Sequence, residues 1–193
     1  MAGKTQTPAA ARLTAEQPAA LYAIPGGARS GSAWVDYRDA FLGSPAALQI
    51  EAIRRGAPAG NLLGAAEALH LPRERVYELV GLSVSTAKRK VAANEVLDPL
   101  VTERLVRLGG IEKLAEETFG DPALAAEWLQ AVNVGLGGVA PLSLLDTEIG
   151  CREVSRVLNA IAYGGAAQYI AYALPVLLVA AGKLSAFRLS RMK

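Results

Sequence analysis

Apolar side chains recur along this chain at intervals of three and four residues, the spacing that places them on one face of an α-helix. No stretch alternates apolar and polar residues over a useful length, as a half-buried β-strand would. Prolines, glycines and small polar residues interrupt the pattern where helices are expected to begin and end. The pattern predicts helices at residues 45–55, 61–69, 72–80, 84–93, 99–108, 111–118, 122–129 and 148–162, a helical turn at 141–145 and a short amphipathic piece at 34–41.

Four boundaries in this pattern carry a specific chemical prediction. Ser44-Pro45 and Asp121-Pro122 each place a residue able to cap a helix before a proline that suits its first position. Asp146-Thr147 is expected to cap the last helix. Gly109-Gly110 is expected to separate two helices, one on each side.

Residues 73–90 are predicted to form two short helices joined at a glycine, which is the layout of a helix-turn-helix. Gly81 allows the positive φ that the turn needs, and Ser83 is placed to cap the second helix. Hydroxyls near the start of that helix can meet base edges or phosphates, and basic residues at its end can neutralise the DNA backbone. Such a basic cluster is also common as a solvated helix end that complements the helix dipole, so both interpretations stay open. The candidate DNA-binding residues are Ser83, Ser85, Thr86, Lys88, Arg89 and Lys90.

Composition and charge divide the chain into four parts. Residues 1–33 are rich in Ala, Pro, Gly, Ser and Thr, which predicts a flexible N-terminal arm, and helical domains are expected at 34–93 and 94–165. The net charge is +4 over residues 1–93, −6 over 94–165 and +4 over 166–193. Two surfaces for two kinds of partner are therefore expected, a basic one for phosphate and an acidic one for a basic protein surface.

The composition supports a helical core and offers little material for catalysis. Because hydrophobic residues make up 52% of the chain and aromatic residues only 6%, the core is expected to consist of Ala, Leu, Val and Ile. The single Cys151 and single His70 exclude a disulfide framework and a multi-histidine metal site, and each is expected to be structural. No catalytic triad, phosphate loop or carboxylate pair stands out, and the glycines of residues 135–138 lack the preceding strand of a dinucleotide fold. We expect no enzyme activity, no cofactor and no metal site.

Residues 102–164 contain a pattern of small, apolar and polar residues that follows the order and spacing of a known family. It consists of Arg104-Leu105, Phe119-Gly120, Ala125, Trp128-Leu129, Asn133, Leu136-Gly137-Gly138, Pro141, Leu144-Leu145-Asp146-Thr147, Gly150, Val154, Leu158, Ile161 and Tyr163-Gly164. With this pattern, residues 102–164 resemble the toxin-binding domain of the Xre/ParS/MbcA antitoxins, and residues 45–93 are similar to the Xre-like N-terminal domain of that family.

The resemblance implies an all-α fold, with an Xre-like helix-turn-helix domain followed by a small helical toxin-binding domain. It implies a toxin of the RES fold, which consumes NAD or transfers ADP-ribose, as the partner whose active site the C-terminal domain occludes. A fragment beginning near Asn94 is expected to suffice for this. The apolar motif residues are mostly expected in the core. The candidate toxin-binding residues are Asn133, Leu136, Arg156, Asn159, Tyr163 and Gly164.

We also expect the protein to repress its own operon by binding operator DNA through the helix pair. A homodimer is expected, because a single short recognition helix buries little surface on DNA and two-fold dimers read paired half-sites. The alternative is a dimeric helix-turn-helix transcription regulator without a toxin partner. The N-terminus lacks the apolar region of a signal peptide, which predicts a cytoplasmic protein.

Residues 166–193 extend past the position where members of this family usually stop. The first part, 166–181, is apolar, but it is shorter than the roughly 20 residues that span a bilayer, and Pro175 interrupts it. A membrane anchor is therefore disfavoured against a segment that packs on this protein, on a second copy or on the toxin. A read-through product remains a further alternative, since residues 187–191 faintly resemble the opening of RES toxins. We expect the basic end of this tail, Lys183 to Lys193, to be mobile.

Overall fold

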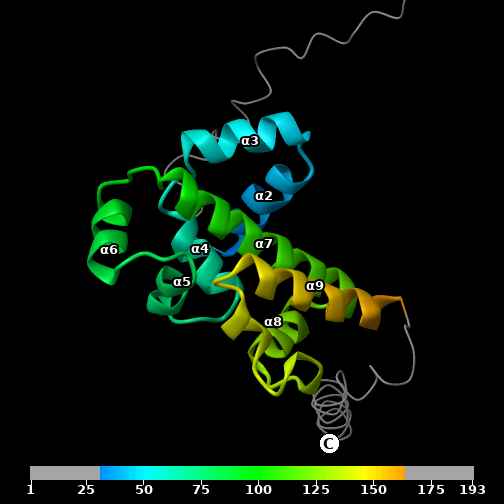
Figure 1. The fold of residues 1–193 in the computed structure, drawn as a ribbon. Coiled ribbons are helices and arrows are strands. Elements are labelled where there is room, and N and C mark those ends of the chain that lie inside the picture. Colours follow the sequence, from blue (N-terminus) through cyan, green and yellow to red (C-terminus); the bar gives the residue numbers. More distant parts are fainter. Residues whose placement is uncertain (1–30, 164–193) are drawn as a thin grey trace, which may run out of the picture.

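A computed structural model describes residues 31–163 of the protein, and every regular element in that range is a helix (Figure 1). The all-α prediction is therefore confirmed. The elements are α2 (Gly31–Leu42), α3 (Ala46–Arg55), α4 (Asn61–Ala68), α5 (Arg73–Leu79), α6 (Val84–Ala92), α7 (Pro99–Phe119), α8 (Pro122–Gln130), the short 3₁₀ helices η1 (Val134–Leu136) and η2 (Pro141–Leu144), and α9 (Glu148–Ala162).

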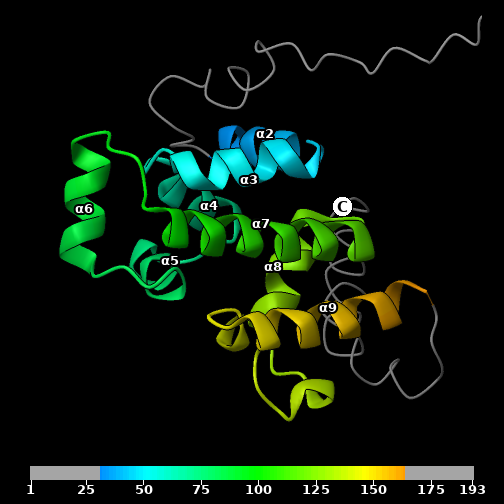
Figure 2. The same ribbon diagram turned by 45° about the horizontal axis from the view of Figure 1, so that its top comes forward.

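Helix α7 is the central element, and both halves of the chain pack on it. It contacts α2 and α3 on one side and α8 and α9 on the other, as Figures 1 and 2 show. The buried apolar residues form one continuous cluster from Trp34 to Leu158. Because this core crosses residue 94, a fragment beginning near Asn94 would leave uncovered the face of α7 on which α2 packs. The expectation that such a fragment suffices is therefore not supported by the packing.

Gly109 and Gly110 lie inside α7, so the prediction of two separate helices was wrong. A methyl group on Gly109 would lie 2.9 Å from Cζ2 of Trp34 and 3.0 Å from Cγ of Arg38. The glycine therefore lets α2 cross α7 at close range. Glycine inside a helix costs about 1 kcal/mol relative to alanine, and this close packing offsets the cost.

Helix α2 begins at Gly31, three residues inside the predicted N-terminal arm, and residues 1–30 lie outside the described range. The amphipathic piece predicted at 34–41 is confirmed. Its aromatic residues Trp34, Tyr37 and Phe41 are all buried. The Gly31 amide donates to Glu67 of α4 at 2.9 Å, which holds the start of α2 against α4.

A buried charge network joins α2 to α7. Arg38 lies within 3.1 Å of Glu112, 2.7 Å of Glu116 and 2.9 Å of Asp39. Trp34 Nε1 donates to Glu112 Oε2 at 2.8 Å. Burial raises the pKa of Glu112 to about 7, although the Arg38 charge and the Trp34 hydrogen bond act to lower it.

The predicted helix caps have mixed outcomes. Asp121 and Thr147 cap α8 and α9 by accepting backbone amides, as expected. Ser44 does not cap α3, because its hydroxyl donates to the Ala40 carbonyl at 2.7 Å and thus closes the end of α2. Sequence alone does not show whether such a serine serves the helix before it or the helix after it.

Candidate functional site

Helices α5 and α6 form the helix-turn-helix that the sequence predicts. The Ser83 side chain caps α6 by accepting from the Thr86 amide at 3.2 Å. Gly81 forms the turn at φ +75°, and a Cβ there would lie 2.0 Å from Nη1 of Arg104. That nitrogen donates to the Val80 carbonyl at 3.3 Å, so Arg104 of α7 closes over the turn. The positive φ favours glycine here, and any side chain at this position would also displace the Arg104 guanidinium from the turn.

The hydroxyl groups at the start of α6 are connected to one another. Ser83 Oγ donates to Thr86 Oγ1 at 2.8 Å and lies 3.2 Å from Ser85 Oγ. Ser83 is therefore mainly committed to holding the helix start. Ser85 is exposed, and its hydroxyl stands at the N-terminal end of the helix, where a base edge or phosphate would approach.

The basic cluster at the end of α6 is paired with acidic residues, which sequence reasoning missed. Lys88 lies 3.4 Å from Glu74, and Arg89 lies 2.6 Å from Glu95. Lys90 lies 3.4 Å from Glu95, and its side chain is only 12% exposed. In the sequence, Glu95 shortly after the cluster was the residue that could have indicated this pairing. Lys88 and Arg89, with side chains 63% and 61% exposed, are the two that phosphate can reach.

The second surface is built on the packing of α8 and α9 against α7. Trp128 of α8 is 1% exposed, and its ring centroid lies 5.6 Å from that of Phe119. Val154 and Leu158 of α9 are fully buried in the same core. The expectation that these motif residues are structural is confirmed. This packing fixes α9 and leaves its other face in solvent.

The structure places Asn133 inside the loop before η1 and not on its surface. Asn133 is 2% exposed, and its side-chain Oδ1 accepts a hydrogen bond from the Gly135 amide at 2.9 Å. Its backbone exchanges hydrogen bonds with Val139 and Gly138 at 3.0 Å each. Leu136 is partly buried and packs against the core. Asn133 therefore shapes the loop, and a direct contact with a partner does not fit its burial.

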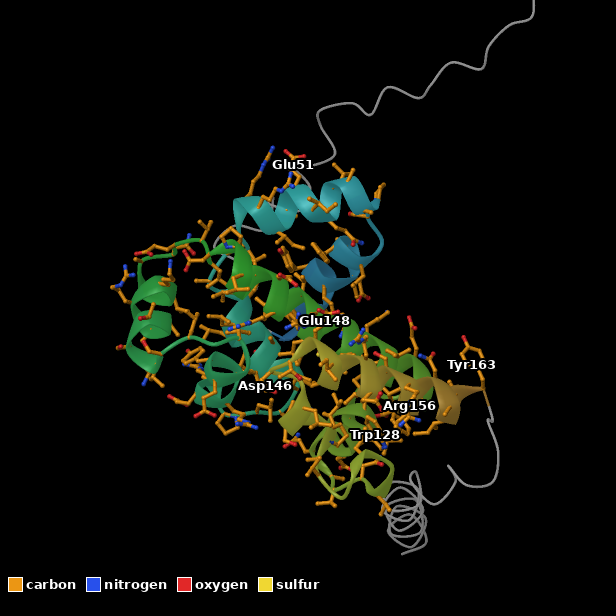
Figure 3. All side chains as sticks on the ribbon, in the orientation of Figure 1. Glu51, Trp128, Asp146, Glu148, Arg156 and Tyr163 are labelled. Carbon is orange, nitrogen blue, oxygen red and sulfur yellow. The ribbon has the colours of Figure 1, made fainter. Side chains whose placement is uncertain are left out.

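Three other candidates share the outer face of α9. Arg156, Asn159 and Tyr163 are exposed and follow the three- and four-residue spacing of one helix face. Figure 3 shows Arg156 and Tyr163 on the half of α9 that leads away from α5 and α6. Tyr163 is 84% exposed. Gly164, the last candidate, lies outside the described residues.

Exposed valines in this part of the protein were not among the sequence candidates. Val132, Val134 and Val139 are 64%, 73% and 39% exposed on the η1 loop. Ile149 at the start of α9 is 66% exposed. Single exposed apolar residues are common, and here three of them lie on one short loop. In the sequence, valines that do not follow the spacing of a helix could have indicated these exposed apolar residues.

No group of His, Cys, Asp and Glu side chains within residues 31–163 has the arrangement of a metal site. Cys151 is buried, and burial raises the pKa of its thiol, which disfavours a reactive thiolate. None of the helices from α2 to α9 is long and apolar enough to cross a membrane.

Comparison with known proteins matches the N-terminal and C-terminal halves of the described chain to two domains of one family. Residues 114–164 match the family model of the antitoxin Xre/MbcA/ParS C-terminal toxin-binding domain, and residues 48–110 match the antitoxin Xre-like helix-turn-helix domain. The chain is 32% identical over 137 residues to a "Prs ADP-ribosylating antitoxin" of Sphingobium sp. (strain YBL2), covering 66% of this chain and 86% of that protein. The chain belongs to the Xre/MbcA/ParS antitoxin family. This antitoxin is also similar to two proteins named "Antitoxin Xre". It is 28% identical over 90 residues to the one from Photorhabdus laumondii, and the match covers 61% of that protein. It is 29% identical over 83 residues to the one from Pseudomonas putida, and the match covers 52% of that protein.

The two family domains of this antitoxin meet within α7, because one match ends at residue 110 and the other begins at 114. One helix thus joins them, and no linker separates them. In both ribbon views α6 lies at the end of the molecule opposite to the C-terminal end of α9 (Figures 1 and 2). The helix-turn-helix and the exposed face of α9 can therefore meet different partners at the same time.

Proposed function

We propose that this antitoxin neutralises a RES-domain toxin by covering the mouth of its active site with the C-terminal domain. The observation that carries the proposal is the match of residues 114–164 to the toxin-binding domain of the family. A relative whose name describes an ADP-ribosylating system supports the choice of partner. The antitoxin needs no catalytic group for this role, since excluding NAD is sufficient.

The exposed residues of the C-terminal domain suit a protein interface. Asn159 and Tyr163 lie on one face of α9, and the valines of the η1 loop add apolar surface. Aromatic anchors with an apolar surround are typical of interface centres. The net charge of −6 over residues 94–165 suits a toxin pocket that attracts an anionic dinucleotide.

The test is co-expression of the full antitoxin with the protein encoded by the neighbouring gene. We expect the antitoxin to restore growth and the cellular NAD level. A protein that binds the upstream DNA but neither binds nor neutralises that gene product would be a transcription regulator and would refute the proposal.

We also infer that the antitoxin represses its operon by placing α6 on operator DNA as a homodimer in the cytoplasm. Lys88 and Arg89 would exchange Glu74 and Glu95 for phosphates, which costs little because exposed ion pairs contribute about 0–1 kcal/mol. A single α6 offers a small contact area, and a two-fold dimer reads two half-sites.

The double variant Lys88→Ala/Arg89→Ala tests this inference. It should reduce the slope of log affinity against log salt concentration by about 3.6, because two residues in each of two subunits make four phosphate contacts and each contact contributes about 0.9 to that slope. Arg54→Ala, which removes an exposed arginine of α3, is the matched control and should leave the slope unchanged. Equal slopes for both variants would remove α6 from the DNA interface.

A further inference from the structure

The η1 loop, residues 131–140, presents apolar side chains to solvent. Val132 and Val134 are 64% and 73% exposed, and Val134 is the most exposed large aliphatic residue within residues 31–163. In both ribbon views the loop, drawn in yellow-green, projects from the body of the molecule on the side opposite to α3 (Figures 1 and 2). A projecting loop can enter a depression that a helix, about 10–12 Å wide with its side chains, would only cover.

The inside of the loop determines where its valines point. Asn133 has an extended backbone conformation and is buried, with Oδ1 accepting from the Gly135 amide at 2.9 Å. Leu136 packs against the core and anchors the loop at η1. Because neighbouring residues of an extended segment point to opposite sides, the burial of Asn133 directs Val132 and Val134 outward together.

Gly137 and Gly138 give the loop its tight return. Their φ angles are +78° and +81°, which glycine adopts without strain, and a Cβ at either position would meet nothing within 4 Å. The backbone conformation, and not close packing, therefore favours glycine at both positions. A loop fixed in this way presents its valines without the entropic cost of ordering a flexible segment on binding.

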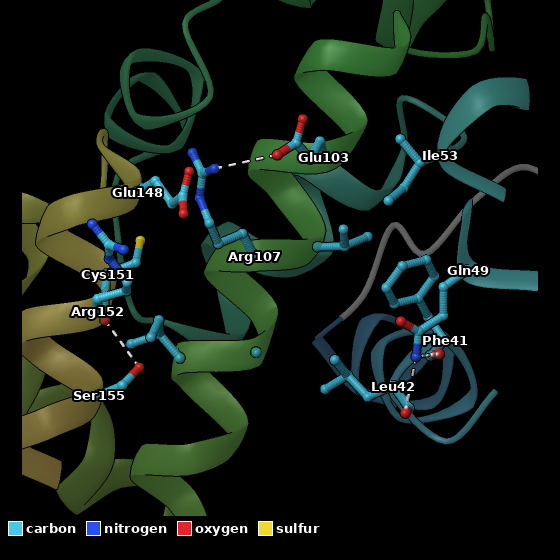
Figure 4. Close-up of a pocket in the computed structure, with 13 residues that line it drawn as sticks. Phe41, Leu42, Gln49, Ile53, Glu103, Arg107, Glu148, Cys151, Arg152 and Ser155 are labelled. Carbon is cyan, nitrogen blue, oxygen red and sulfur yellow. Dashed lines mark hydrogen bonds and ion pairs between the residues drawn. The ribbon is translucent and has the colours of Figure 1, made fainter. Parts of the chain in front are cut away.

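The loop carries no charge, unlike the helices around it. Between Glu127 and Asp146 the sequence contains no charged residue. The charged residues of α9 lie elsewhere on the domain, and Figure 4 shows Glu148 and Arg152 lining a groove together with Arg107 of α7. Since residues 94–165 have a net charge of −6, the loop is an uncharged projection of an acidic domain.

The loop belongs to the part of the antitoxin that is assigned to toxin binding. It lies within residues 114–164, which match the toxin-binding domain of the family. Its η1 helix lies against α9, whose outer face carries the proposed toxin contacts. The apolar tail at residues 166–181 and the basic end of the chain lie outside the described residues, whereas the whole loop lies within them. The toxin is therefore the partner that the loop is placed to meet.

We propose that Val132 and Val134 enter the NAD-binding cleft of the toxin as an apolar plug, while the outer face of α9 contacts the rim of the cleft. This inference rests on the proposed function. A cleft that binds NAD holds aromatic rings, which favours apolar contacts, and anionic phosphates, which favours positive charge. The uncharged valines suit the part of the cleft that holds a ring, and the acidic helices beside them suit its positive surround.

The double variant Val132→Thr/Val134→Thr in the full antitoxin tests the apolar contact. Threonine keeps the β-branched shape of valine, and both positions are exposed, so the fold is retained. Calorimetry with the proposed RES-domain toxin should show a loss of affinity of about ten-fold or more, because hydroxyl groups in an apolar subsite lose their hydrogen bonds to water. Val96→Thr, at a 54% exposed position before α7, is the matched control and should bind as the wild type does.

A pair of charged variants at one position tests whether the loop enters the positive cleft. Val134→Lys should bind the toxin about ten-fold or more weakly than Val134→Glu, because the cleft that attracts phosphates repels a second positive charge. The same two substitutions at Val96 should differ from each other by less than about two-fold, because salt screens charges that lie far from the interface.

The outcomes separate this inference from the proposed function. A wild-type antitoxin that does not bind the toxin would refute the proposed function and the role of the loop with it. If the wild type binds, equal affinities of the wild type and Val132→Thr/Val134→Thr would overturn only the role of the loop. Equal affinities of Val134→Lys and Val134→Glu would overturn the placement of the loop in the cleft.

Discussion

Replacing Glu112 with glutamine should remove a pH dependence of stability that this single buried carboxyl group creates. Glu112 is 3% exposed. Its principal cation, Arg38, is shared with Glu116 and Asp39, so the positive charge compensates only part of the burial. Glutamine retains an oxygen that can accept from Trp34 Nε1 and cannot ionise.

The magnitude follows from the difference between the pKa of Glu112 in the folded and unfolded chain. Burial raises the pKa from its ordinary value of 4.5 to about 7. Between these values the folded protein holds a proton that the unfolded chain has lost, so the free energy of unfolding falls as the pH rises. The total fall is about 3–4 kcal/mol, since one pKa unit corresponds to about 1.4 kcal/mol. Asp39 affects the pH dependence of stability only at lower pH. Burial raises the pKa of its carboxyl group, but the hydrogen bonds and charges of Arg38 and Lys113 lower it by more.

Urea unfolding at pH 5, 6, 7 and 8, followed by the fluorescence of Trp34 and Trp128, measures this effect. Wild type should lose stability from pH 5 to pH 7, and Glu112→Gln should not show that loss. Glu117→Gln changes an exposed glutamate of the same helix and should follow wild type. The reasoning fails if Glu112→Gln and wild type show the same dependence on pH.

Two further substitutions test the packing. Gly81→Ala should lower the free energy of unfolding by about 1–2 kcal/mol for the positive φ alone, and by more because the added methyl group meets Arg104. Gly120→Ala measures the cost of the positive φ by itself, because Gly120 has a similar φ and no neighbour within 4 Å; equal losses for the two variants would exclude a contribution from Arg104. Leu158→Ala should cost about 2–5 kcal/mol in urea unfolding because the side chain is fully buried, whereas Ile149→Ala should cost less than about 0.5 kcal/mol, and similar costs would contradict the placement of α9.

Helical spacing and local capping chemistry predicted most of the helices. Gly81, Ser83, Asp121 and Thr147 act where the sequence placed them, because their roles depend on residues within one turn. The continuity of α7 could not be predicted in this way. Gly109 usually indicates a break, and here it serves contact with Trp34, which lies 75 positions earlier in the chain.

The candidate surfaces show the same division between local and long-range effects. The exposed face of α9 follows from its spacing, so Arg156, Asn159 and Tyr163 are accessible as expected. Asn133 is buried by a loop whose closure depends on Val139, which sequence spacing does not show. The pairing of Lys88 with Glu74 likewise depends on how α5 packs against α6.

The affinity of the full antitoxin for the proposed RES-domain toxin tests the central claim most directly. The double variant Asn159→Ala/Tyr163→Ala removes two exposed side chains from the face of α9 and leaves the core intact. Leu100→Ala is the matched control, because it truncates a 57% exposed residue at the N-terminal end of α7. Calorimetry should show at least a ten-fold loss of affinity for the double variant and an unchanged affinity for the control. An unchanged affinity for the double variant, or no binding by the wild type, would contradict the account.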